Sequence, residues 1–264
     1  MRPRAAAALA ALLVLLLLAV PAAGERARKG DLIVSLDGGI VPNRLPRHSP
    51  APVSLELSGS VRTADGSPLP RLTTLELALG NGGTIDTDGL PVCRRDQLRA
   101  TSPEAARRIC GAALVGHGKL AIEIFIAGQE PFEYKASLLA FNGRGPGGRP
   151  IIWLHVYGTE PPATFLLRFS LSHQEGGLGT VLRARVPAYL HELPHLARFE
   201  IEIGRDFSAA GARHGYLDAD CPLPPRFHAG IFPFAKASYA FVDGERTSVT
   251  IVRGCRVRPL AGRS

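Results

Sequence analysis

The chain has 264 residues, of which 45% are hydrophobic, and a formal net charge of +8 at pH 7. This length allows one large domain or two small ones, with a substantial apolar core. The basic residues are nearly all arginine and are scattered along the chain, so a nucleic-acid footprint is not indicated.

Residues 1–24 are predicted to be a signal peptide. Arg2 and Arg4 precede an uninterrupted apolar run over residues 5–20, and small residues follow Pro21. An uncleaved membrane anchor is the alternative, but a membrane span needs about 20 apolar residues and this run ends at proline. We therefore expect a secreted or extracytoplasmic protein.

The first half of the mature chain contains alternating apolar and polar residues, which predict strands. The best alternation places Leu75, Leu77 and Leu79 on one face of a strand. Ser102 and Pro103 are suited to the N-cap and first position of the one convincing helix. In this half, strands are predicted at residues 31–37, 53–63, 72–79, 114–127 and 132–142.

A glycine-rich loop at residues 144–148 is the predicted boundary between two halves, residues 25–143 and 144–264. The second half also contains a series of short alternating segments. Their spacing, with a single short helix in the chain, predicts an all-β fold of the antiparallel β-sandwich type. In this half, strands are predicted at residues 151–158, 164–172, 179–187, 198–204, 237–242 and 247–252.

One stretch occurs twice. Residues 69–80 return as residues 193–204 without a gap, and both copies have Leu, Pro, Leu, Glu and Gly at corresponding positions. Each copy is typical of a loop, a strand and a glycine turn in succession. The repeat predicts that the two halves are related sandwich units.

The four cysteines of an exported chain should form two disulfide bonds. Of the three possible pairings we favour Cys93–Cys110 with Cys221–Cys255, which places one bond in each half. A zinc site is the alternative, but no two cysteines have the short C-x2-C spacing typical of one.

Three short motifs carry a family resemblance: LAFNG at residues 139–143, HVYG at 155–158 and FPFA at 232–235. Together with the signal peptide they resemble an uncharacterised secreted family of high-GC Gram-positive bacteria. The resemblance covers most of the mature chain. It implies no activity and therefore no catalytic residues.

His191, Glu192 and His195 match the H-E-x-x-H signature of zinc proteases. That chemistry needs both imidazoles on one face of a helix, with the glutamate beside the metal-bound water. Pro194 disfavours this helix, and the first copy of the repeat indicates a loop that leads into a strand. A secreted zinc metallohydrolase that uses this motif is therefore the alternative function and not the favoured one.

Two other loops have alternating aspartates, Asp86 with Asp88 and Asp218 with Asp220. Such carboxylates can chelate calcium, but the distal glutamate of the full calcium-loop signature is missing. We interpret them as turn-forming residues and expect no cofactor.

Trp153, His155 and Tyr157 alternate with apolar residues, so they should share one face of their strand. An exposed aromatic row could stack on sugar rings. The alternative is that another part of the chain covers this face and makes a second core.

Taken together, the sequence predicts a secreted, non-enzymatic protein that acts by binding or as a structural surface component. Its possible partners are a cell-wall glycan or an anionic surface polymer, and nucleic acid is not expected. The ligand and the oligomeric state do not follow from the sequence.

Overall fold

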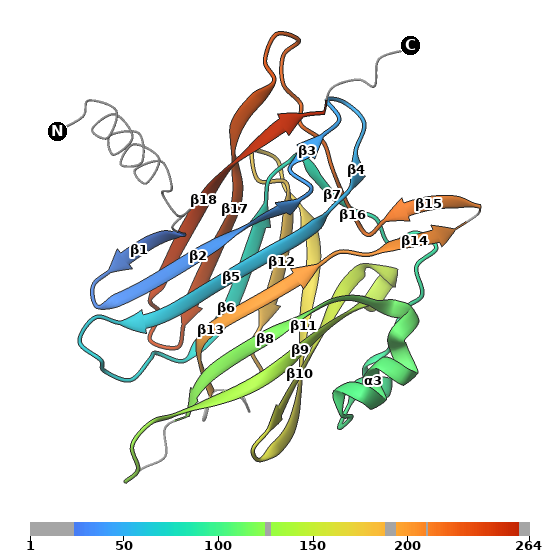
Figure 1. Cartoon of the computed structure of the whole chain (residues 1–264). Coiled ribbons are helices and arrows are strands. Elements are labelled where there is room, and N and C mark those ends of the chain that lie inside the picture. Colours follow the sequence, from blue (N-terminus) through green and yellow to red (C-terminus); the bar gives the residue numbers. More distant parts are fainter. Residues whose placement is uncertain (1–23, 125–127, 188–193, 210, 259–264) are drawn as a thin grey trace, which may run out of the picture.

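Alternating apolar and polar residues form one continuous, mainly antiparallel sheet of 13 strands in the computed structural model (Figure 1). The structure describes residues 24–124, 128–187, 194–209 and 211–258, so the predicted signal peptide lies almost wholly outside the described residues. The all-β prediction is confirmed. In order across the sheet, the strands are β1 (Glu25–Lys29), β2 (Leu32–Val41), β5 (Ser54–Thr63), β13 (Pro194–Ile203), β8 (Leu114–Ile124), β9 (Phe132–Arg144), β10 (Pro150–Thr159), β11 (Pro162–His173), β12 (Thr180–Arg185), β6 (Leu72–Leu79), β17 (Ala229–Phe241), β18 (Arg246–Val257) and β3 (Arg44–Leu45).

Two small sheets and a short helical segment accompany the large sheet. One small sheet contains β4 (Ala51–Pro52), β16 (Leu217–Ala219) and β7 (Gly83–Ile85), and the other is the hairpin of β14 (Asp206–Ala209) and β15 (Ala212–Gly215). The helical elements are α2 (Arg95–Leu98), α3 (Pro103–Cys110), η1 (Gly111–Ala113) and η2 (Pro146–Gly148).

The helix α3 begins as the sequence predicts, because the Ser102 hydroxyl accepts the backbone N–H of Ala105 at 3.3 Å. Within the part of the chain that the structure describes, no helix has the length and apolar character needed to cross a membrane.

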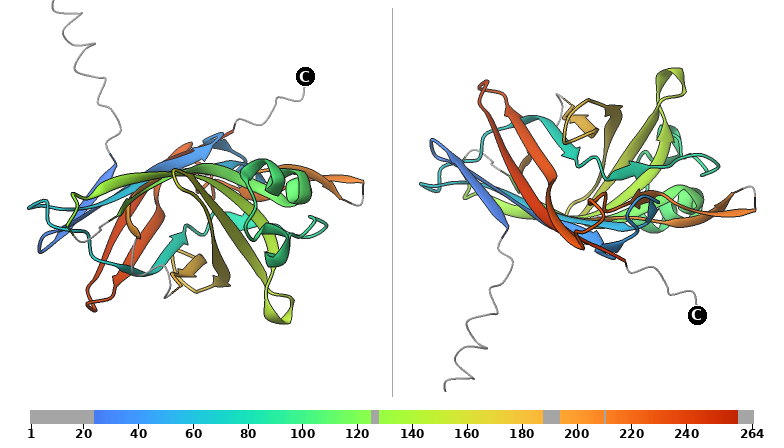
Figure 2. Two further views of the ribbon diagram at one scale, coloured as in Figure 1. Left: turned by 90° about the horizontal axis from the view of Figure 1, so that it is seen from below. Right: turned by 90° about the horizontal axis from the view of Figure 1, so that it is seen from above.

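The large sheet curls until β18 comes close to β1 and β2, so the strands surround an interior (Figure 2). The apolar faces of the strands therefore meet inside one curled sheet, in place of two separate sheets that face each other. On β6, for example, Leu75 and Leu77 pack with the main core, while Thr74 and Glu76 face outward. The two-residue period of a strand produces this division.

The seam between β18 and the β1–β2 hairpin has no strand pairing among the described residues. Side chains hold it instead. Arg253 on β18 forms ion pairs with Glu25 at 3.2 Å and with Asp37 at 2.5 Å. Its Nε also donates to the carbonyl oxygen of Gly38 at 2.6 Å. The curled sheet is thus closed by charged side chains rather than by a backbone ladder.

The two predicted halves are interleaved in this sheet. Of the repeated strands, β6 lies between β12 and β17 of the second half, and β13 lies between β5 and β8 of the first. The boundary predicted at residues 143 and 144 falls at the end of β9, which pairs directly with β10. The two-halves repeat is not confirmed, because long-range pairing joins both halves into one sheet.

Both predicted disulfide bonds are present. Cys93 and Cys110 have Cα atoms 5.6 Å apart, and the Cα atoms of Cys221 and Cys255 are 5.9 Å apart. The first bond ties together the segment that contains α2 and α3. The second connects the chain after β16 to β18, and it therefore fastens a small sheet to the large one.

Candidate functional site

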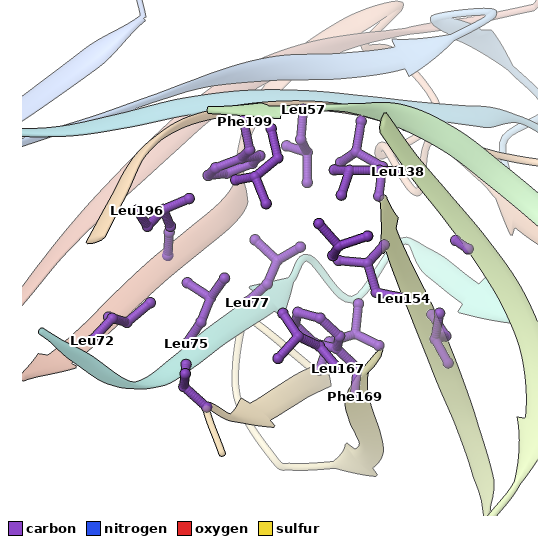
Figure 3. A pocket seen from close by; sticks show the side chains of 18 of the residues that line it. Leu57, Leu72, Leu75, Leu77, Leu138, Leu154, Leu167, Phe169, Leu196 and Phe199 are labelled. Carbon is purple, nitrogen blue, oxygen red and sulfur yellow. The ribbon is translucent and has the colours of Figure 1, made fainter. Parts of the chain in front are cut away.

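An apolar cavity of about 170 Å³ lies in the interior of the curled sheet (Figure 3). Every residue that lines it is Leu, Ile, Val, Ala or Phe. Figure 3 shows side chains entering the space from both facing layers of the sheet. Those labelled there are Leu57, Leu72, Leu75, Leu77, Leu138, Leu154, Leu167, Phe169, Leu196 and Phe199.

The strand register explains why these side chains meet. Leu57 on β5 is paired with Ile201 on β13, and both line the cavity. On the other side, Leu77 on β6 is paired with Leu182 on β12 and with Ala237 on β17. Directly paired residues of antiparallel strands share a face of the sheet, so each pairing adds another apolar wall.

A second hollow of about 310 Å³, here called the mouth cavity, continues along the same strands. Leu55, Leu79 and Thr180 line it and stand two residues beyond Leu57, Leu77 and Leu182. Measured along β6 from its first residue to its last, the interior is about 24 Å long, at about 3.4 Å per residue.

Of the two interior cavities, as lined by the described residues, only the mouth cavity has polar side chains in its walls. They are Asn81, Thr84, Thr180, Asp218, Asp220 and Arg253. The interior therefore changes from purely apolar at one end to mixed at the other.

Burial raises the pKa of both Asp218 and Asp220 above the usual range of aspartate. For Asp218 the nearby Asp86 carboxylate raises the pKa further, while His214 opposes the shift. The His214 Nδ1 atom lies 3.3 Å from Asp86 Oδ2. The mouth thus disfavours the charged form of these two carboxyl groups.

The aspartate loops do not form a metal centre among the described residues, where no group of three or more potential ligands is found. Asp86 Oδ1 instead accepts the backbone N–H of Asp88 at 2.9 Å. This is the turn-forming arrangement that the sequence favours at Asp86 and Asp88. For Asp218 the prediction of a turn is wrong, because this residue lies within strand β16, where it pairs with Pro52 and Thr84.

The aromatic row on β10 lies under the segment that contains α2 and α3. His155 is 0% exposed, and its Nε2 lies 3.1 Å from Thr101 Oγ1 and 3.0 Å from the Thr101 carbonyl oxygen. Trp153 is half-buried against a second apolar cluster around Leu98 and Phe141.

Tyr157, also half-buried, stacks on His155 with ring centroids 6.5 Å apart. Burial lowers the pKa of His155 and keeps its ring neutral. The aromatic face of β10 is therefore covered by another part of the chain and forms a second core. It is not an open aromatic platform. Ligand binding at Trp153, His155 and Tyr157 stays a prediction that the arrangement does not support.

The H-E-x-x-H motif falls partly outside the described residues, since His191 and Glu192 are not among them. Pro194 begins strand β13 and His195 follows in the same strand. His195 is 9% exposed, and burial lowers the pKa of its imidazole. The end of the motif is therefore extended, so it does not provide the single helical face that zinc-protease chemistry requires.

The cavity itself was missed by the sequence reasoning. A sequence signal for the cavity is present in β11, where Phe165, Leu167 and Phe169 stand at every second position and all line the cavity. The alternation predicts an apolar face but not which other faces it meets. In the comparisons, no protein-family model, curated protein or solved structure matches this chain.

Proposed function

We propose that this protein is a secreted, non-enzymatic binding protein that holds an apolar molecule, or the alkyl chain of an amphipathic one, inside the curled sheet. The apolar cavity carries the proposal, because its walls offer no hydrogen-bonding or charged side chain. Two disulfide bonds support an extracytoplasmic location. Ligand pockets are typically mainly apolar with a few polar groups at defined places.

The size of the cavity supports occupancy by a ligand. An empty space of about 170 Å³ costs on the order of 4 kcal/mol, at about 24 cal/mol per Å³. This is a large share of a typical unfolding free energy of about 5–15 kcal/mol. An apolar ligand that fills the space restores van der Waals contacts. Its binding removes no polar group from water, so no group is left without a hydrogen-bond partner.

The mouth cavity indicates how an amphipathic ligand is oriented. Its chain would occupy the apolar cavity, and its head would lie beside Asp218 and Asp220. Arg253 is already paired with Glu25 and Asp37, so it is not available as a dedicated partner for an anionic head. We therefore expect a neutral or cationic head, such as a hydroxyl or an amine, and not a carboxylate.

The test is binding of N-phenyl-1-naphthylamine, an uncharged apolar fluorophore, to parent and variant proteins. Leu167→Trp fills the cavity from β11 and should weaken binding at least tenfold. Arg168→Trp places the same side chain at the exposed neighbouring position and should leave binding unchanged. Circular dichroism establishes that both variants remain folded.

Should Leu167→Trp fail to fold, Ala237→Leu supplies a smaller filling change from β17. A parent protein that shows no saturable fluorescence increase would overturn the proposal. Equal affinity in the parent and in a folded, cavity-filled variant would overturn it as well.

A further inference from the structure

A wide groove of about 840 Å³ lies on the outer face of the sheet, over β12, β6, β17 and β18, with β1 at its side. We call it the basic groove. Five cationic side chains line it, against the single carboxylate of Glu76. The cationic residues are Arg28, Lys29, Arg183, Arg185 and Arg246.

The strand register builds this groove. Arg185 is paired with Thr74, Thr74 with Ala240, and Ala240 with Arg246. Two arginines therefore stand at the ends of one row across four strands, with two small residues between them. Neighbouring strands are about 4.8 Å apart, so the two arginine backbones are separated by about 14 Å along the sheet.

The next row has the same character. Arg183 is paired with Glu76, Glu76 with Ser238, and Ser238 with Ser248. Small hydroxyl-bearing residues thus make the floor of the groove, while arginines make its walls. Among the described residues, the hydroxyls of Ser238 and Ser248 form no hydrogen bond that would occupy them.

Most of the positive charge in the groove is not neutralised by the protein. Arg183 Nε lies 2.7 Å from Glu76 Oε2, and Arg28 forms an exposed ion pair with Asp31 at 3.7 Å. The guanidinium groups of Arg185 and Arg246 have no ion pair with any described residue. A guanidinium can bind a carboxylate through two parallel hydrogen bonds, so these two arginines suit an anionic ligand.

We infer that the basic groove binds a strand of a linear acidic glycan, with its carboxylates on the arginine walls and its hydroxyls on the serine and threonine floor. A membrane surface fits less well, because membrane docking uses exposed large apolar side chains. Among the described residues that line the groove, the one aromatic side chain is Tyr239, which is 1% exposed. Single-stranded nucleic acid needs exposed aromatic rings for stacking, so it also fits less well.

This site is separate from the apolar cavity. Glu76 and Thr74 face the groove, while the intervening Leu75 faces the interior. A glycan on the outer face therefore does not compete with an apolar ligand inside. The groove would hold the protein on an acidic polysaccharide while its interior remains available.

The experiment measures binding of polygalacturonate, a linear polyuronate, to the full mature chain by titration calorimetry at low and at physiological salt. Because the contacts are exposed ion pairs, affinity should fall as salt rises. The double variant Arg185→Glu, Arg246→Glu should bind at least tenfold more weakly. The control Arg99→Glu, Arg256→Glu has the same net charge with both changes at exposed positions outside the groove, and should differ from the parent by less than twofold.

Four results would overturn the inference: no binding by the parent, an equal loss in both double variants, equal binding of neutral dextran, or groove-dependent binding of phosphatidylglycerol vesicles as tight as that of the glycan. If the double variant does not fold, Arg185→Ala and Arg246→Ala are measured singly. Binding of N-phenyl-1-naphthylamine should be unchanged in the groove variants, which separates this site from the interior.

Discussion

The interior of the curled sheet and the basic groove are built from the same strands and have opposite chemistry. On β6, Leu75 and Leu77 line the apolar cavity, whereas Thr74 and Glu76 line the groove. A step of one residue separates the two surfaces. The alternation that makes the sheet foldable therefore also divides it into an apolar binding space and a charged outer face.

The outer face is itself divided by charge. Over β2, β5, β13 and β8, a second groove has the carboxylates of Asp37, Glu56, Glu200 and Glu202, and Lys119 as its lysine. The net charge of +8 therefore conceals an acidic and a basic surface on one molecule. The placement of charge along the strands, and not its total, therefore determines what the outer face can bind.

The largest effect is expected from a charge placed on the wrong face of β6. Leu77→Asp puts a carboxylate into the apolar cavity, where no side chain can pair with it, and should cost on the order of 5 kcal/mol. Thr74→Asp puts the same group beside the groove arginines and should change stability by less than about 1 kcal/mol. Urea unfolding measures both changes, and equal costs would contradict the assignment of faces.

Removal of the disulfide bonds should follow in size. The bonds enclose sequence separations of 34 residues for Cys221–Cys255 and 17 for Cys93–Cys110. In the loop-entropy treatment their loss costs about 4 and 3 kcal/mol, respectively. Thermal unfolding of the two double serine variants tests this order. The predicted order would be wrong if the variant without Cys221–Cys255 were more stable than the variant without Cys93–Cys110.

Local signals in the sequence predicted much of this fold. The inward leucines of β6 and the Ser102 cap are correct because they depend on periodicity and on a neighbouring backbone group. Both cysteine pairings are also correct, and each bond joins cysteines that follow one another in the sequence. The partners of each strand were not predictable, since β6 pairs with β12 and β17 through contacts distant in the sequence. The apolar cavity and the cover over His155 depend on that pairing, so they could not be inferred from any single segment.

A smaller effect is expected at the covered face of β10. Burial lowers the pKa of His155 below the ordinary value of 6.5, so the folded state favours the neutral ring. Its contribution to stability is therefore fully present above pH 6.5 and is lost as pH falls through the lowered pKa. His155→Gln should make the acid side of the melting-temperature profile shallower. An unchanged profile between pH 7 and 5 would show that His155 is not held neutral.

The smallest effect is expected at the mouth cavity. Burial raises the pKa of Asp218 above the ordinary value of 3.8, so the folded state favours the protonated form. Ionisation therefore destabilises the protein as pH rises through the raised pKa. Asp218→Asn should raise the melting temperature at pH 7, and this gain should vanish below the ordinary pKa of aspartate. A gain that persists unchanged in acid would point to a cause other than charge.

Native mass spectrometry of the protein purified from its native host shows most directly whether the interior of the curled sheet holds an apolar or amphipathic molecule. We expect one bound small molecule per chain, released on denaturation and absent from folded Leu167→Trp, while Arg168→Trp retains it. A parent protein that carries no molecule and also fails to take up added N-phenyl-1-naphthylamine would contradict occupancy of the interior.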